Sequence, residues 1–231
     1  MEEPVVQKHE VIERLKANSF FLVGSILYLP VSFWDLVAQE HDLPNPAEKK
    51  IYLFLWIAAT GAYLLNGLLE TKTAYTTHKS RKADGKSGRI GGIFNGLLFT
   101  FAATFELLHV IFGRNIILLS ISAHVYVLNA LYTLWLGRKY GISTVPDKMT
   151  KAGDVLFLLG ASMDMTGSYL EIAGKLSNPA GYSMMTTVAW FTDALLYFVA
   201  NKISLDSHVD ADEIQTEMTP KAEPSKLSEV V

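Results

Sequence analysis

The chain has 231 residues, a formal net charge of −3 at pH 7 and no cysteine. The weak charge gives no support for a nucleic-acid partner, and the missing thiols exclude disulfides, thiolate zinc sites, iron–sulfur clusters and cysteine nucleophiles. Hydrophobic residues make up 50% of the chain. They lie in six blocks, each about long enough to cross a bilayer core of roughly 30 Å as a helix. We therefore predict an all-α integral membrane protein with six transmembrane helices.

The N-terminal residues 1–18 carry mixed charge, and we expect them to form a cytoplasmic arm. Residues 5–16 place their apolar side chains near one side of a helix. This pattern fits either a short helix on the membrane surface or a loosely ordered arm. The first predicted hairpin, 19–70, contains helices over 20–38 and 51–69.

The second hairpin, 91–136, reverses at Gly113 and Arg114, so its two helices must be antiparallel neighbours. The third hairpin, 154–200, contains helices over 154–173 and 182–199. From residue 201 onward the chain is polar, acidic and without apolar periodicity, and we expect a disordered tail over 201–231.

The orientation follows from lysine and arginine. The segments that join the predicted hairpins hold six and four basic residues, whereas the segments on the other side hold four in total. By the positive-inside rule the basic segments are cytoplasmic, and six spans then place both termini in the cytoplasm. The basic stretch 72–89 is also suited to anionic lipid headgroups, although its charge is explained by topology alone.

Three similar units follow one another along the chain. Asn66, Asn129 and Asp193 each come three residues after an aromatic residue, and they are spaced by 63 and 64 residues. In the odd-numbered helices, the same alignment makes Tyr28, Glu106 and Asp164 equivalent. We therefore predict three tandem helical hairpins around a pseudo-threefold axis, with chance similarity among apolar helices as the alternative.

Small residues are expected where helices approach closely. Gly88, Gly92 and Gly96 have the small-xxx-small spacing that brings helix backbones together in membranes. The first hairpin, with FFLVGSILYL in its first helix and an aromatic-rich, Asn-containing second helix, resembles the YrhK-type membrane domain. The resemblance covers mainly residues 20–70. It implies a fold of helical hairpins and supplies neither a mechanism nor functional residues.

Polar residues inside the predicted spans are the candidates for function, because ionisable side chains are costly in hydrocarbon and usually face the bundle interior. We predict a small channel or transporter-like protein in which such residues line a polar path, as polar rings do in pores. The alternative is a membrane scaffold or assembly subunit, in which the same side chains only join helices. The path candidates are Glu106, Asp164, Asp193, Asn66 and Asn129.

A metal site is a weaker alternative. Glu106 and His109 share a helix face and His124 lies on the partner helix, but the two histidines are offset by roughly 9 Å along the axis. No catalytic residues are predicted, because no serine has a His–Asp partner at helical spacing. The lipid bilayer is the expected partner. The sequence leaves open the cofactors, the kind of membrane and whether the protein forms a homo-oligomer.

Overall fold

The computed structural model describes residues 4–38, 46–83, 90–138, 143–176 and 178–218. These residues form six α-helices and no strand. The helices are α1 (Pro4–Ala38), α2 (Pro46–Ala83), α3 (Ile90–Ile111), α4 (Ile116–Gly137), α5 (Val145–Ile172) and α6 (Pro179–Met218). The all-helical prediction is confirmed, and each of the six predicted helices overlaps one of the observed ones.

The helix α5 begins at Val145 rather than at residue 154, and three other helices also run further than the apolar blocks predict. The expected N-terminal arm is part of α1 from Pro4, α2 continues past residue 69 to Ala83, and α6 continues past residue 201 to Met218. Neither glycine nor proline interrupts these three extensions, and charged pairs one turn apart support them. The Arg14–Glu10 pair lies at 2.5 Å and the Lys202–Asp206 pair at 2.8 Å. The last residues of the predicted tail, 219–231, lie outside the described part.

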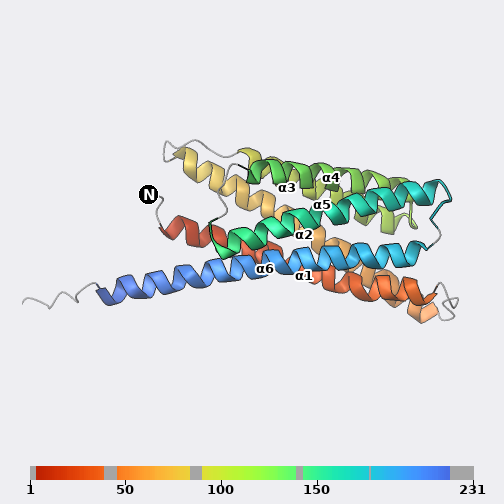
Figure 1. The fold of residues 1–231 in the computed structure, drawn as a ribbon, viewed down its shortest axis with the longest axis horizontal. Helices are drawn as coiled ribbons and strands as arrows, with labels where there is room; N and C mark the ends of the chain where they lie inside the picture. The colour runs from red at the N-terminus through yellow and green to blue at the C-terminus, as the bar shows by residue number, and fades with distance from the viewer. Residues whose placement is uncertain (1–3, 39–45, 84–89, 139–142, 177, 219–231) are drawn as a thin grey trace, which may run out of the picture.

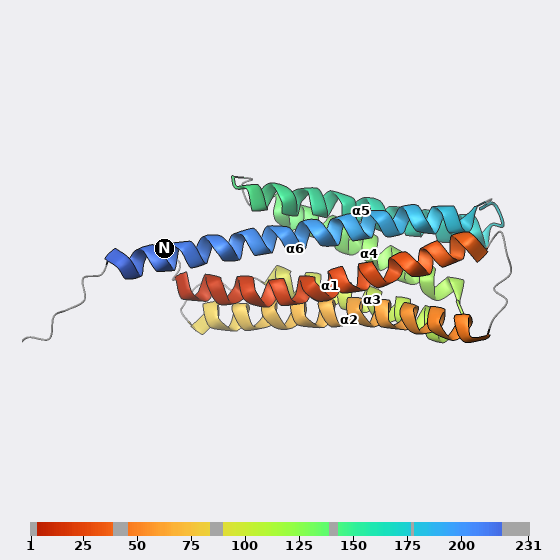
Figure 2. The same cartoon turned by 90° about the horizontal axis from the view of Figure 1, so that it is seen from below.

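The helices form a closed ring. Helices that follow each other in the chain pack together, and α6 returns to pack on α1. The bundle is elongated, and the described start of α1 and end of α6 lie at the same end of it (Figures 1 and 2). The turn between α3 and α4 therefore lies at the opposite end, together with the end of α1 and the start of α6.

The outside of the ring is apolar. Among the described residues, five helices (α1, α2, α3, α4 and α6) are long and apolar enough to cross a membrane by length and composition. This pattern indicates an integral membrane protein that contacts the lipid bilayer. Every helix exposes large apolar side chains. Examples, one from each helix from α1 to α6, are Phe33, Phe54, Phe101, Leu128, Leu159 and Val188.

The helix α5 is the exception to the six predicted spans, because it is not among these five. Its polar residues lower its hydropathy while its outer face stays apolar. Asp154 is buried and Asp164 bonds to α6, whereas Val155 and Leu159 are exposed. The structure thus supports five spans on composition.

A cluster of aromatic rings fills the middle of the ring of helices. Each helix contributes one ring, in the order Phe21, Tyr63, Phe99, Tyr126, Phe157 and Trp190, and all six are buried. Many neighbouring rings meet edge to face, for example Tyr126 and Trp190 with centroids 4.9 Å apart. Such pairs add to the free energy gained from burial alone. The cluster closes the interior at mid-height.

The close approach of α2 and α3 depends on glycine, as the small-xxx-small spacing predicts for Gly96. A Cβ built on Gly96 would lie 2.8 Å from the backbone nitrogen of Thr71, and one on Gly67 would lie 2.9 Å from that of Thr100. Gly92 faces Ala74 at 3.3 Å, whereas Gly88 lies outside the described residues. These two helices therefore pack backbone against backbone.

The start of α5 is held by a capping box. The hydroxyl of Thr144 accepts a hydrogen bond from the amide of Asp147, whose carboxylate accepts one from the amide of Thr144 at 2.9 Å. Hydrogen bonds from Thr144 and Ser143 lower the pKa of Asp147. An acid with a lowered pKa stabilises the folded state above its unfolded pKa of about 3.9, and the effect is lost as the pH falls below that value.

We therefore expect Asp147→Asn to destabilise the protein at pH 7 by about 0.5–1 kcal/mol, the usual contribution of such a cap. At about pH 2 the difference in thermal midpoint between the variant and the parent should be smaller than at pH 7, because the contribution of the ionised carboxylate is lost progressively as the pH falls below about 3.9. Thermal unfolding in detergent at both pH values measures this. Asp206→Asn, which changes an exposed acid in a one-turn pair, is the control and should follow the parent. An equal loss at both pH values would contradict the assignment.

Candidate functional site

A cavity of about 420 Å³ lies inside the ring, between the aromatic cluster and the end that carries the α3–α4 turn. Its lining includes Arg114 of that turn, Leu176 and Pro179, which place its mouth at this end. Ligand pockets in proteins usually measure about 300–1,000 Å³. All six helices contribute to its walls, with Tyr28, Trp56, Glu106, Tyr126, Asp164 and Trp190 as one residue from each.

Glu106 lies deep in this cavity, at 8% exposure. Its carboxylate accepts hydrogen bonds from the hydroxyls of Tyr28 at 2.6 Å and Tyr126 at 2.9 Å. The Tyr28 hydroxyl accepts in turn from the indole nitrogen of Trp56 at 2.7 Å. Four helices thus hold this carboxylate in one position, and its partners are hydroxyl donors rather than a basic residue. Such bonds orient the acid without neutralising it.

Asp164 lines the same cavity from α5. One carboxylate oxygen accepts a hydrogen bond from the indole nitrogen of Trp190 at 2.9 Å, and Glu106 lies close enough to interact with Asp164 electrostatically. The sequence alignment pairs Glu106 with Asp164 as equivalent positions, and the structure brings them to one space. Two acids with no basic partner among their hydrogen bonds give the deep part of the cavity an acidic character.

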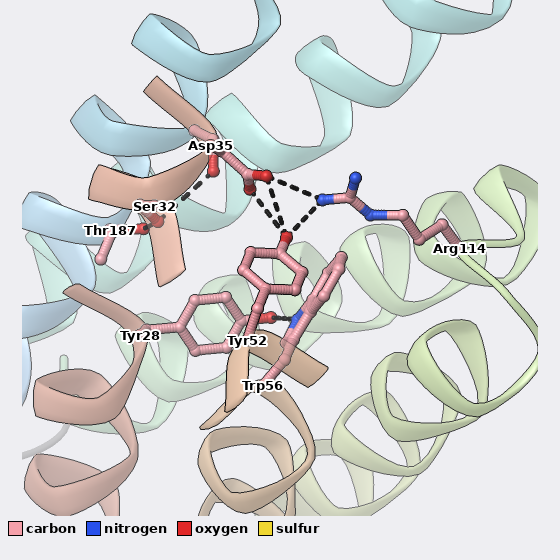
Figure 3. Close-up of polar contacts among 8 residues, drawn as sticks. Tyr28, Ser32, Asp35, Tyr52, Trp56, Arg114 and Thr187 are labelled. Atoms are coloured by element: carbon pink, nitrogen blue, oxygen red, sulfur yellow. Dashed lines mark hydrogen bonds and ion pairs between the residues drawn. The ribbon is translucent and has the colours of Figure 1, made fainter. Parts of the chain in front are cut away.

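The mouth is crossed by Arg114, whose φ of 66° is in the left-handed region. Its guanidinium forms an ion pair with Asp35 at 3.0 Å and donates to the Tyr52 hydroxyl (Figure 3). It also lies over the ring of Trp56, 4.7 Å from the centroid. A strained conformation at a non-glycine residue is typical of functional sites. Arg114 thus joins the α3–α4 turn to α1 and α2 across the mouth.

The charge of Arg114 is stabilised where it lies. Partial burial acts to lower its pKa, but Tyr52 and Asp35 outweigh burial and raise the pKa above its usual value. By its position in the sequence, Arg114 is only a turn residue. Its neighbours could have been found from topology, because Asp35, Tyr52 and the α3–α4 turn all fall at the same end of the bundle.

Two more candidates lie on the other side of the aromatic cluster. Asp193 is fully buried, and neither of its carboxylate oxygens has a hydrogen-bond partner. Asn66 is also buried, and its side-chain oxygen has no partner. Asp154 and Glu70 lie close enough to act on Asp193 electrostatically. Asp154 precedes Asp164 by ten residues on α5, roughly 15 Å along the axis, so this group is a second polar region outside the cavity.

Asn129 has a different environment from the other candidates. Its amide donates to the backbone oxygen of Asn95 at 2.8 Å and to the Asn95 side chain at 2.9 Å. The Thr133 hydroxyl donates to the same side chain at 2.9 Å. This network joins α3 to α4, and it places Asn129 in a helix–helix contact rather than in the cavity wall.

The residues of the metal alternative do not converge on one point. His124 uses both ring nitrogens, with the Ser120 carbonyl at 2.6 Å and the Tyr169 hydroxyl at 2.7 Å. His109 faces the carbonyl of Asn115 at 2.8 Å. Within the described residues, no group of three His, Asp or Glu side chains is arranged to hold a metal ion.

Comparisons with known proteins add no assignment. No family model, no curated protein and no solved structure matches this chain. The resemblance of residues 20–70 to the YrhK-type membrane domain therefore stays an expectation. A proposal for function has to be based on the geometry of the cavity.

Proposed function

We propose that this protein is a small channel or transporter in which Glu106 and Asp164 line a polar path. The observation that carries the proposal is the cavity of about 420 Å³, which all six helices wall and which both acids enter. Binding sites between repeat units near the bilayer midplane are typical of transporters. Asp193 and Asn66 extend the path on the other side of the aromatic cluster, which acts as a barrier in this conformation.

The membrane arrangement that the proposal needs has all six helices crossing the bilayer and both termini in the cytoplasm. The exposed apolar side chains of α5, Val155 and Leu159, support a sixth span. The basic segments support the orientation, because they flank the ends of helices on the side of the termini. The cavity mouth then opens on the opposite side of the membrane, and residues 72–83, the last turns of α2, lie near the cytoplasmic leaflet.

Three related hairpins are part of the proposal, and the aromatic cluster supports them. Phe21, Phe99 and Phe157 each precede one of the aligned residues Tyr28, Glu106 and Asp164 by seven positions. These rings and the aromatic residues of the even-numbered helices belong to one buried cluster. Their common position in one cluster supports the proposed pseudo-threefold arrangement.

Flux measurements in proteoliposomes test the proposal. Purified full-length protein should pass protons or small cations, and Glu106→Gln combined with Asp164→Asn should reduce that flux by at least about tenfold, since the path loses both carboxyl groups. Asp206→Asn, outside the cavity, is the matched control and should keep the flux. Flux that survives the double change would remove these acids from the path. The absence of any flux would overturn the proposal.

A non-catalytic scaffold is the second candidate, and the hydrogen bonds from Asn129 and Thr133 to Asn95 favour it, because they only join helices. Under this reading the double change would alter thermal stability or self-association and no flux would be found. Interhelical hydrogen bonds of this kind contribute about 0.6 kcal/mol each, so single changes at Asn129 should have small effects in either case.

A further inference from the structure

We propose that the ligand of the cavity is a small organic cation, a substituted ammonium or guanidinium compound. The inference deepens the proposed function and rests on the same cavity, but ligand binding can be measured without any flux. Three features of the cavity support it. Most of the charged groups that line it are acidic, aromatic side chains form part of its walls, and an arginine of the chain is bound by aromatic rings and a carboxylate at its mouth.

The charges that line the cavity favour a cation. Four carboxyl groups line it, from Asp35, Glu106, Asp164 and Glu171, together with one arginine and one histidine, His109. Asp35 pairs with that arginine at the mouth. The hydrogen bonds to Glu106 and Asp164 come from hydroxyl and indole donors, so an entering cation would meet two acids that have no basic hydrogen-bond partner among the described residues. An anionic ligand would be repelled by these acids, and a neutral one would gain nothing from their charge.

The walls of the cavity are suited to an organic rather than a hydrated ion. Aromatic side chains line part of the cavity, among them Tyr28, Trp56 and Tyr182. The faces of such rings attract ammonium and guanidinium groups within about 6 Å of the centroid. The carboxylate oxygens of Glu106 both accept hydrogen bonds from tyrosines, so they stabilise a nearby charge at a distance rather than coordinate a bare metal ion.

At the mouth of the cavity, aromatic rings and a carboxylate already bind an organic cation, the guanidinium group of Arg114. The Arg114 guanidinium lies over Trp56 at 4.7 Å and over Tyr52 at 5.4 Å, and it pairs with Asp35. Two aromatic rings and one carboxylate therefore bind an organic cation at the entrance. Deeper in, the Asp164 carboxylate lies at the edge of the Trp190 ring, whose indole nitrogen donates to it, and no cation from the described residues is among its hydrogen-bond partners.

Binding to the purified full-length protein in detergent tests the inference, with choline as the probe. Its neutral carbon isostere, 3,3-dimethylbutan-1-ol, has nearly the same shape and lacks the charge. We expect choline to bind and to raise the thermal midpoint, and the isostere to do neither. Asp164→Asn should weaken choline binding by at least about tenfold, since it removes one partner of a desolvated charge, whereas Asp206→Asn should leave the affinity unchanged.

The outcomes separate this inference from the proposed function. Equal binding of choline and the isostere would overturn it, because the cavity would then select shape and not charge. Proton or inorganic-cation flux without choline binding would overturn it while leaving a transport path in place. Choline binding without flux of any ion would support it and overturn transport. The comparison of the two probes needs no variant, so it decides the question even if Asp164→Asn fails to fold.

Discussion

The Asp193→Asn variant is expected to be more stable than the parent protein, by about 1–3 kcal/mol. Asp193 is fully buried and neither carboxylate oxygen has a hydrogen-bond partner. A buried charge without a partner costs more than a buried neutral polar group, so exchanging the carboxyl group for an amide removes the larger of the two penalties. Asp154 and Glu70 act on Asp193 electrostatically, so a neutral amide of the same shape removes repulsion as well. The thermal midpoint in detergent should rise by roughly 3–9 °C.

Asp154→Asn is the matched control, because it changes a buried acid of the same region that does have partners. The Asp154 carboxylate accepts a hydrogen bond from the Tyr197 hydroxyl at 2.7 Å and faces the Lys151 amine at 3.6 Å. Neutralising it should lower the midpoint, opposite to the change at Asp193. If Asp193→Asn lowers the midpoint to the same degree, Asp193 has a stabilising partner in solution. Increased stability with lost flux would mark Asp193 as a residue kept for function.

The second large effect is expected where α2 and α3 touch. Gly96→Ala should destabilise the protein by about 1–3 kcal/mol, because the new methyl group would lie 2.8 Å from the Thr71 nitrogen and 2.9 Å from its Cα. Backbone atoms cannot move aside as a flexible side chain can, so the two helices would have to separate. The thermal midpoint should fall by roughly 3–9 °C.

Gly61→Ala is the control for this prediction, with the opposite sign. Gly61 lies in the interior of α2, and a Cβ built on it has no atom within 4 Å. Alanine favours a helix over glycine by about 0.5–1 kcal/mol, so this variant should match or exceed the stability of the parent. Equal changes at both positions would show that helix propensity, rather than the α2–α3 contact, governs the effect.

The extent of the helices shows how far local patterns can be used for prediction. Apolar runs locate the membrane-spanning parts, since hydrocarbon requires about 20 apolar residues per helix. The same rule begins α1 too late and ends α2 and α6 too early, because polar residues continue a helix as long as neither glycine nor proline interrupts it. It also predicts a sixth span over α5, which is not among the five helices that are apolar enough by composition, because its polar residues lower its hydropathy.

The candidate site, too, can be predicted only in part from the sequence. Glu106 and Asp164 can be selected from sequence, because an ionisable residue in an apolar helix needs an interior position. The same argument selects Asn129, which bonds to Asn95 on the neighbouring helix, and it cannot tell a cavity wall from a helix contact. Arg114 is not selected in this way, because a basic residue in a turn at the membrane interface is common. Only the structure places Asp35 and Trp56 beside it.

The sequence by itself determined the class of the protein, the number and order of its helices and the side chains too polar for lipid. These depend on residue types within one helix and on the hydrocarbon around it. Only the tertiary structure decided which of those side chains share a space, because that depends on how six helices close into a ring and on which direction each side chain takes within it. The cavity, its acidic interior and the arginine across its mouth exist only once α6 packs against α1.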